Sequence, residues 1–457
     1  MVKNGLFCVI IAFIAPVASA EGIGAPSRPG IDAPELAALG TFAVGVRTVT
    51  VVDRDAVDVL SFDVSTGKAA QRDRKLLVDI WYPATPSAGA TAETYTAMME
   101  SEPPAVPAHF AIPGIAVRDA PPIKGRFPLI IVSHGYGNVT AGMSWLTENL
   151  ASKGYVVAAI RHEDTAYGEA AGFSQVLLRR PLDIAVVAHD LQRSRNWAGV
   201  LDSNRTALVG YSMGGYGVLT AAGAILDPKG PIMNLVPGGL LEPYAQGGVH
   251  VAAVKVQNVR AVVAISPAGG SLNAWGLTGL GGIDAPLMLI SGDHDHTVDY
   301  TSGARHIYEA ARGARRYLLT FLGAGHALGL GPAPEEMRQH LWDQDWFEDP
   351  VWRKDRLIGV NLHMITAFLD RYVKHDETRA AYLDVLTPLS SEGVWPVPSA
   401  TVTPPATAVS PATARAPYDA RSPGGAENSV WKGFQRKHAE GLELLQHAPD
   451  SMGASRH

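Results

Sequence analysis

The chain has 457 residues, of which 47% are hydrophobic and 18% are charged, and its formal net charge is −6. This apolar fraction is enough to bury a large core, so a wholly disordered chain is excluded. The acidic balance argues against a nucleic-acid-binding protein, because contact with phosphates requires clustered lysine and arginine. The 47 glycines and 32 prolines favour a loop-rich fold over a helical bundle.

The first twenty residues are typical of a signal peptide. Lys3 precedes an apolar stretch over residues 6–17, and residues 18–20 have the small side chains that a signal peptidase accepts. The apolar stretch is shorter than the about 20 residues of a spanning helix, so no stable membrane span is expected. We expect cleavage after Ala20 and a secreted or periplasmic mature protein. Cleavage there would remove Cys8, the single cysteine, and with it any disulfide or cysteine nucleophile.

Short apolar runs alternate with helical patterns between residues 44 and 374. The predicted strands are rich in β-branched residues and cover residues 44–52, 75–82, 128–133, 155–160, 207–211, 261–266, 287–291 and 317–322. The predicted helices cover residues 143–153, 183–201, 215–226, 302–312 and 357–374. Strands without polar alternation are typical of a parallel sheet that helices cover on both faces. The first two strands lie close together in the sequence, which favours an antiparallel opening pair. The pattern therefore predicts an α/β fold with a mostly parallel central sheet.

We predict one catalytic domain, over residues 36–387, followed by a linker and a short tail. Three irregular segments interrupt the domain as insertions near residues 98–125, 227–258 and 328–355. Long loops of this kind can roof an active site. The aromatic residues of the third insertion either do this or pack an extension onto the surface.

The end of the chain differs in composition from the predicted domain. Residues 388–425 are rich in proline, alanine and threonine, as extended linkers are. Residues 426–457 have too few apolar side chains for a core of their own, and could form a short helix over residues 426–446. We expect a docked or mobile tail.

The strongest catalytic signal is the motif Gly210-Tyr211-Ser212-Met213-Gly214. A G-x-S-x-G motif between a strand and a helix holds its serine on a sharp turn, with the hydroxyl above the sheet. The flanking glycines are needed because a Cβ there would collide with the neighbouring strand and helix. The helix that follows directs its N-terminal N–H groups toward the serine, which favours developing negative charge. We predict that Ser212 is a nucleophile; the alternative is a tight turn whose serine only caps a helix.

A serine nucleophile needs a base, and the base needs a carboxylate that holds its tautomer. His326 is the predicted base, because it lies on a glycine-rich loop after the last predicted strand. Both Asp293 and Asp295 follow the strand over residues 287–291. We favour Asp295 as the acid, since the residues after it can turn the chain into the next helix. Asp293 is expected to shape the loop.

The tetrahedral oxyanion also needs hydrogen-bond donors. The sequence His134-Gly135-Tyr136-Gly137 follows the strand over residues 128–133, where an open loop can aim a main-chain N–H at the serine. We predict that the N–H groups of Tyr136 and Met213 form this oxyanion hole. His134 is then expected to fix the loop by hydrogen bonding. The side chains predicted as candidates to line the cleft are His134, His162, Glu163 and Tyr211.

Two clusters contain residue types that bind metals, His162-Glu163-Asp164 and residues 293–296. Neither has the H-E-x-x-H spacing that brings two imidazoles to one helix face. No phosphate-binding loop of the G-x-x-x-x-G-K-[ST] type is present, and no G-x-G-x-x-G opens a helix after an early strand. We therefore expect neither a metal nor a cofactor. The oligomeric state is not indicated.

Taken together, these motifs resemble the α/β-hydrolase superfamily, in which the residues follow the chain order serine, acid, histidine. Within it, residues 78–83 (Val-Asp-Ile-Trp-Tyr-Pro) and the sequence Arg180-Pro181-Leu182-Asp183 look like the platelet-activating-factor acetylhydrolase and predicted dienelactone hydrolase branch. Secreted cutinase-like polyesterases have a similar Ser-Met-Gly-Gly elbow and Gly-Tyr oxyanion loop. The resemblance covers about residues 44–374. True dienelactone hydrolases use a cysteine where this chain has Ser212, which argues against that substrate.

The resemblance implies a secreted serine hydrolase that cleaves carboxylic esters with small acyl groups through an acyl-enzyme intermediate. The expected partner is therefore a small-molecule ester. An amidase or peptidase with the same triad is the alternative within catalysis, because the motifs do not distinguish esters from amides. A non-catalytic binding module on the same fold is the alternative outside it.

Overall fold

The computed structural model describes residues 30, 32–100, 107–164, 170–339, 341–394, 429–435 and 438–450. The predicted signal peptide lies outside these residues. So do residues 395–428, which contain most of the predicted linker.

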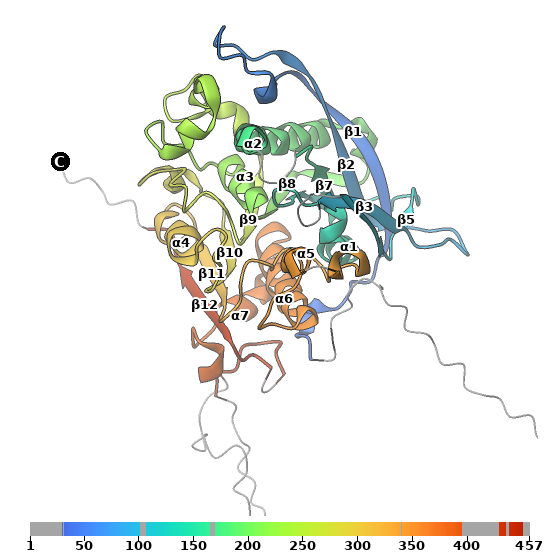
Figure 1. Cartoon of the computed structure of the whole chain (residues 1–457). Coiled ribbons are helices and arrows are strands. Elements are labelled where there is room, and N and C mark those ends of the chain that lie inside the picture. The colour runs from blue at the N-terminus through green and yellow to red at the C-terminus, as the bar shows by residue number, and fades with distance from the viewer. Residues whose placement is uncertain are drawn as a thin grey trace, which may run out of the picture.

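A ten-stranded sheet runs through the centre of the molecule, in the order β12-β11-β10-β9-β8-β6-β7-β2-β1-β5 (Figure 1). Its strands in chain order are β1 (Ala43–Val57), β2 (Gln71–Ala84), β5 (Val117–Arg118), β6 (Phe127–Ser133), β7 (Val156–Arg161), β8 (Leu201–Tyr211), β9 (Val259–Ile265), β10 (Leu287–Gly292), β11 (Arg316–Phe321) and β12 (Leu442–His447). The six strands from β6 to β11 are parallel, and β1 and β2 form an antiparallel pair that joins them through β7. All eight strands predicted from the sequence are confirmed.

Helices cover both faces of this sheet. They are α1 (Ser144–Ser152), α2 (Ala170–Arg193), α3 (Met213–Ala221), α4 (His306–Ala310), α5 (Leu341–Asp345), α6 (Lys354–Val373) and α7 (Ala380–Leu383). Side chains of α2, α3 and α4 pack in one core with Leu129 and Ile131 of β6, whereas α1 and α6 pack in a second core with Ile130 and Val132. Successive residues of a strand point to opposite faces. Because both faces are covered, β6 is apolar at every one of these positions.

The largest difference from the predicted helices is in α2, which we expected over residues 183–201. The helix instead begins at Ala170, ends at Arg193 and contains Pro181. Proline lacks an N–H, so the carbonyl four residues earlier loses its helical partner. That carbonyl belongs to Leu177, and the hydroxyl of Tyr216 on α3 donates to it at 3.0 Å. The contact between α2 and α3 therefore permits Pro181 inside the helix. The sequence alone had suggested that this proline lies before the helix.

The three predicted insertions have short elements of their own. The first contains β4 (Pro107–Pro113), which pairs antiparallel with β3 (Thr94–Glu100) at the start of the insertion. The second contains a series of 3₁₀ turns between Pro231 and Val254. The third contains α5 and another 3₁₀ turn, Glu335–Arg338.

The prediction that residues 426–446 could form a short helix is wrong for the residues of that segment that the structure describes. Residues 442–447 form β12, which pairs antiparallel with β11 from Leu442 opposite Phe321 to His447 opposite Arg316. Leu442 and Leu444 are buried, whereas the intervening Glu443 is not, which is the two-residue period of a strand. The tail therefore completes the edge of the central sheet.

Candidate active site

Ser212 lies at the junction of β8 and α3, in a strained backbone conformation with φ of +54° and ψ of −117°. Non-glycine residues with positive φ are uncommon, and they cluster at functional sites. A side chain at either flanking glycine of this turn would collide with neighbouring backbone atoms. A Cβ on Gly214 would lie 1.9 Å from the carbonyl oxygen of Ser133, and one on Gly210 would lie 2.2 Å from the carbonyl oxygen of Gly214. These two glycines therefore allow the serine to stand on a sharp turn above the sheet.

Three predicted residues from different strands meet at this turn. The Oγ atom of Ser212 lies 3.0 Å from Nε2 of His326, and Nδ1 of His326 lies 2.8 Å from Oδ2 of Asp295. His326 follows β11 and Asp295 follows β10, so the side chains meet at the carboxyl ends of parallel strands. Such a chain of contacts can transfer the serine proton to the imidazole while the carboxylate holds the ring.

The carboxylate of Asp295 is fully buried and well supplied with donors. Its Oδ1 atom accepts backbone hydrogen bonds from Thr297 at 3.0 Å and from Val298 at 3.2 Å. Burial acts to raise the pKa of Asp295, but the hydrogen bond to His326 and these two N–H groups outweigh it, so the pKa is lowered. The group is therefore kept ionised beside the imidazole.

Asp293, the other candidate acid, lies away from the imidazole contact. Its Oδ1 atom accepts a hydrogen bond from the Gly323 N–H at 2.5 Å. This contact ties the loop after β10 to the loop after β11, which carries His326. The residue shapes the loop, as we expected.

A cavity of about 360 Å³ opens over Ser212. Its lining includes Tyr136, Met213, Tyr211 and His326, together with the apolar side chains Phe173, Leu272, Val298 and Trp346. Met213 is the first residue of α3, and N–H groups in the first turn of a helix have no partner within that helix. Both residues predicted for the oxyanion hole thus lie at the cavity that contains the Ser212 hydroxyl.

Tyr211 packs against His326 and hydrogen-bonds to its backbone. Its ring lies 5.3 Å from the imidazole of His326, and its hydroxyl donates to the His326 carbonyl at 3.2 Å. A Cβ on Gly329 would lie 2.2 Å from the Tyr211 ring, so the chain after His326 wraps closely around it.

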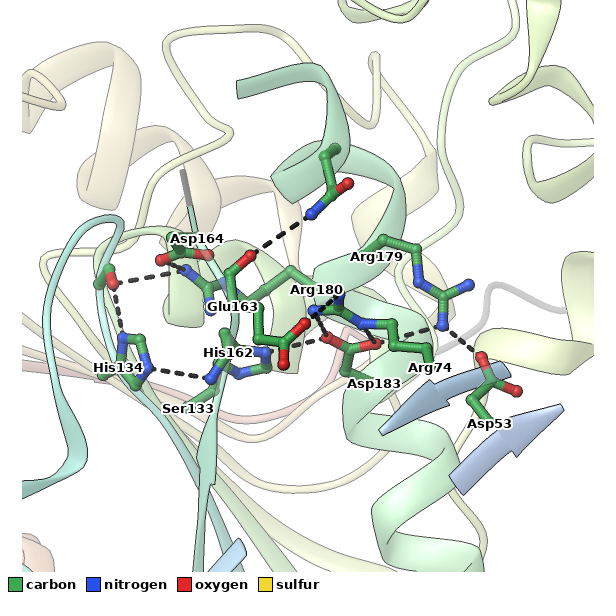
Figure 2. A network of polar contacts seen from close by, with 12 residues as sticks. Asp53, Arg74, Ser133, His134, His162, Glu163, Asp164, Arg179, Arg180 and Asp183 are labelled. Carbon is green, nitrogen blue, oxygen red and sulfur yellow. Dashed lines mark hydrogen bonds and ion pairs between the residues drawn. The ribbon is translucent and has the colours of Figure 1, made fainter. Parts of the chain in front are cut away.

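The two other predicted histidines, His134 and His162, do not line this cavity but line a neighbouring one, and both belong to a buried polar network (Figure 2). His134 Nδ1 donates to the Gly135 carbonyl at 2.7 Å, and its Nε2 accepts the His162 N–H at 3.3 Å. His162 lies 2.9 Å from the Ser133 hydroxyl and 3.1 Å from Asp183. His134 therefore holds the loop, as predicted.

Burial keeps these imidazoles neutral. Burial, together with the nearby charge of Arg180, lowers the pKa of His134 to about 3 and that of His162 to about 4. The side chain of Glu163, which we had predicted to line the cleft, is 70% exposed and lies 3.6 Å from Arg74. It is not among the residues that line the Ser212 cavity, because its side chain turns toward β2.

The same network contains a clamp on the loop after β6, an ion pair that sequence reasoning missed. Arg180 forms a 2.8 Å ion pair with Asp164 and contacts the Gly135 carbonyl at 3.4 Å. Asp164 in turn accepts the Gly137 N–H at 3.0 Å. The charged pair therefore holds the residues on both sides of Tyr136. Both residues occur in the sequence motifs named above, but no sequence pattern pairs them.

Neither candidate metal cluster forms a coordination site in the described part of the chain, where no three histidine, cysteine, aspartate or glutamate side chains gather as ligands would. His294 and His296 are exposed, with their rings stacked 6.3 Å apart. Within the same residues, no helix is both long and apolar enough to cross a membrane.

The order of the strands and the elbow between β8 and α3 are those of the α/β-hydrolase fold. Residues 120–232 match the model of a family described as PETase, PET hydrolase-like. Over 110 residues the chain is 34% identical to Cutinase 2 of Thermobifida cellulosilytica and to Cutinase cut1 of Thermobifida fusca. Each match covers 24% of this chain, and 39% and 32% of those two proteins respectively. The chain thus spans less than half the length of the curated relatives that it matches.

Among solved structures, a ferulic acid esterase from Streptomyces cinnamoneus aligns with a TM-score of 0.49 and 18% identity, over 77% of this chain and 94% of that one. The strand order confirms the predicted α/β-hydrolase fold. The family match and the cutinase relatives confirm the resemblance to cutinase-like polyesterases that the sequence motifs indicated.

Proposed function

We propose that the protein is a serine hydrolase that cleaves carboxylic esters through an acyl-enzyme intermediate. The observation that carries this proposal is the continuous chain of contacts from Ser212 through His326 to the buried Asp295. Similarity to cutinases over a quarter of the chain supports ester substrates in particular.

In the proposed reaction, Ser212 Oγ attacks the ester carbonyl carbon while His326 Nε2 takes its proton. The carbonyl oxygen becomes an oxyanion, which the N–H groups of Met213 and Tyr136 stabilise. When the intermediate collapses, the bond to the alcohol oxygen breaks and His326 gives the proton to that oxygen. Water then repeats the sequence on the acyl-enzyme, releasing the acid and restoring the serine. Asp295 stabilises the imidazolium throughout.

The proposal is tested by covalent labelling of the purified full chain with a fluorophosphonate probe, followed by peptide mapping. We expect one label, on Ser212. The matched control is Ser271, a second serine that lines the same cavity. Ser212→Ala should abolish labelling, whereas Ser271→Ala should retain it. A label on another residue, or no label on folded wild-type protein, would show that the assignment is wrong.

We also propose that the protein is exported, and that residues 36–387 form its catalytic domain, with β12 added to the same sheet. Support for export comes from the N-terminal sequence alone, in which an apolar stretch ends at Ala18-Ser19-Ala20. Mass spectrometry of the protein from the native host would identify its first residue. A mature chain that begins at Glu21 is the expected result, and an intact Met1 in the cytoplasm would contradict it.

A further inference from the structure

A second cavity, of about 440 Å³, lies beside the one over Ser212. The β3–β4 hairpin provides one wall, with Thr96 and His109, and β2 provides the floor, with Trp81. The loop after β6 separates the two cavities, and Asn138 on that loop lines both. Asn138 is thus the lining residue that the two cavities share.

The charges in this second cavity are paired. Arg161 donates to both oxygens of Asp79 at 2.7 Å, and Arg118 donates to Glu93 at 3.1 Å. The side chains of Arg161 and Arg118 are 47% and 38% exposed, so they remain open to a ligand. Because each cation is already paired with a carboxylate, the cavity has no net charge that would attract a carboxylate or an ammonium group.

Such a lining suits hydroxyl groups. A hydroxyl can donate to a carboxylate and accept from a guanidinium at the same time, whereas an apolar group would cover these polar atoms without replacing their water. The rings of Trp81 and Tyr95 are not open to a ligand, since Trp81 is 1% exposed and its indole N–H donates to the Tyr95 hydroxyl. The cavity thus favours a polar, uncharged group.

Asn138, at the junction, has an unsatisfied donor. It is 6% exposed, and its Nδ2 atom has no hydrogen-bond partner among the described residues. A buried polar atom left unpaired costs about 1–3 kcal/mol. Rotation about the terminal torsion of the side chain, which has broad minima, would present this N–H to a substrate passing between the cavities.

The order of the strands decides which half of an ester enters the second cavity. His326 must reach the departing alcohol, and it follows β11, on one side of the β8 elbow. The second cavity adjoins β7 and β2, on the other side of that elbow. The alcohol therefore lies toward His326, and the acyl part lies toward Asn138.

We propose that the second cavity is a subsite for the far end of the acyl group, and that it selects acyl groups carrying a hydroxyl there over those ending in a methyl or a charged group. This inference rests on the proposed esterase function and names part of its substrate. After Ser212 has taken the acyl group, the same contacts hold it on the enzyme until water releases the acid.

The test uses the full chain and 4-nitrophenyl esters that share one leaving group. Their acyl chains are matched in length and end in methyl, hydroxyl, carboxylate or ammonium, and several lengths are compared. At the length that reaches the cavity, we expect kcat/KM for the hydroxyl ester to exceed that of the methyl ester about tenfold, the equivalent of about 1.4 kcal/mol. Equal kcat/KM for all end groups at every length would overturn the proposal.

Charge variants make the test sharper. Arg118→Gln leaves Glu93 unopposed, so it should raise the relative kcat/KM of the ammonium ester. Glu93→Gln should do the same for the carboxylate ester. The matched controls are Arg305→Gln and Glu309→Gln, which break an exposed ion pair between the residue before α4 and α4 itself, and which should leave the order of the substrates unchanged. The same order of substrates in all four variants would count against the subsite.

A third variant blocks the cavity at its exposed rim. Thr96→Trp should remove the preference for the hydroxyl ester, and a retained preference would contradict the proposal. Failure of this inference is distinguishable from failure of the esterase function. In the first case the wild type is labelled at Ser212 and cleaves these esters without preference; in the second it is not labelled and cleaves none.

Discussion

Arg180 forms a buried ion pair with Asp164 directly beneath the loop that carries Tyr136, and its side chain is 1% exposed. Arg180 comes from α2, whereas Asp164 follows β7, so two elements are joined at this point. Through Gly135 and Gly137 the pair holds both neighbours of a proposed oxyanion donor. A donor of this kind stabilises a transition state only if it is held in place before the reaction.

Removal of the Asp164 carboxylate is therefore expected to slow turnover without direct contact with substrate. Asp164→Ala should lower kcat about tenfold to a hundredfold and change KM little, because the loop loses its acceptor at Gly137. It should also destabilise the fold by about 3–5 kcal/mol, since Arg180 would be left buried without a partner. Steady-state kinetics and thermal unfolding measure the two effects.

The conservative variant distinguishes positioning from general damage. Asp164→Asn keeps an oxygen that can accept from Gly137, so it should recover a large part of kcat while remaining less stable than wild type. If both variants have wild-type kcat in their folded form, the clamp has no role in turnover.

The two aspartates after β10 are expected to respond very differently to the same change. Asp295→Asn should lower kcat by about ten-thousandfold, because an amide at this position holds the wrong tautomer of the imidazole. Asp293→Asn keeps an acceptor for the Gly323 N–H and should change kcat far less. Ester hydrolysis by both variants is the measurement. Comparable losses in the two would show that the acid has been misassigned.

The sequence was sufficient to predict eight strands of the central sheet and the order of the site residues. The apolar strands are short and uninterrupted, and the residues that meet at Ser212 each follow a predicted strand, so the parallel arrangement alone brings them to one edge. The clamp was not predictable in this way. Its members Arg180 and Asp164 have the same residue types as many surface ion pairs, and only the path of α2 brings them together.

The helices were harder to predict because tertiary contacts override local signals. Pro181 was expected to lie before the helix, yet a hydroxyl from α3 satisfies the carbonyl that the proline leaves free. The strand β12 was missed for a related reason. It is a short segment far along the chain, and its pairing depends on the open edge of β11, which no local pattern contains.

The glycine after the elbow is expected to tolerate no side chain. Gly214→Ala would place a Cβ 1.9 Å from the Ser133 carbonyl oxygen, where both partners are backbone and neither can move alone. We expect a loss of more than about 4 kcal/mol in the free energy of unfolding, or failure to fold. Gly281→Ala is the control, because nothing lies within 4 Å of its Cβ. Denaturant unfolding of the two variants should differ widely, and similar curves would refute the close approach.

Stability is expected to fall as the pH is lowered from neutral, because several buried histidines must stay neutral in the folded protein. Burial lowers the pKa of His363 to about 3, as it does for His134, whereas the unfolded chain takes up the proton near the usual value of 6.5. Between these limits the unfolded state binds more protons than the folded state. The stabilisation is therefore complete above about pH 6.5 and is lost as the pH falls toward the folded value, by up to about 1.4 kcal/mol per pH unit for each histidine.

His363 allows this slope to be measured. Its Nδ1 accepts the Leu36 N–H at 3.1 Å, and its Nε2 lies 3.2 Å from the Lys432 carbonyl, while the charges of Lys153 and Arg379 lie nearby. His363→Gln removes one titrating group, so its thermal midpoint should depend less steeply on pH between 4 and 6.5 than that of wild type. Identical slopes in wild type and His363→Gln would contradict the assignment.

The C-terminal segment is expected to be part of the stable fold. Trp431 is 2% exposed, its Nε1 donates to the Thr387 carbonyl at 2.9 Å, and its ring packs 6.0 Å from that of Phe434. Trp431→Ala should cost about 3–5 kcal/mol, as deletions of large buried side chains do. Trp431→Phe keeps most of the packing and loses the hydrogen bond, so it should cost about 1–3 kcal/mol. Thermal unfolding of the full chain measures both.

This loss of stability should leave the chemistry at Ser212 intact. The segment lies against the outer edge of β11, and Gly441 accepts the Leu322 N–H at 2.9 Å just before the loop that carries His326. At temperatures where the Trp431 variants remain folded, that backbone contact persists, so kcat should stay within a few-fold of wild type. A midpoint equal to that of wild type would mean that the segment does not dock in solution. A collapse of kcat in folded Trp431→Ala would instead make the segment part of the machinery that positions His326.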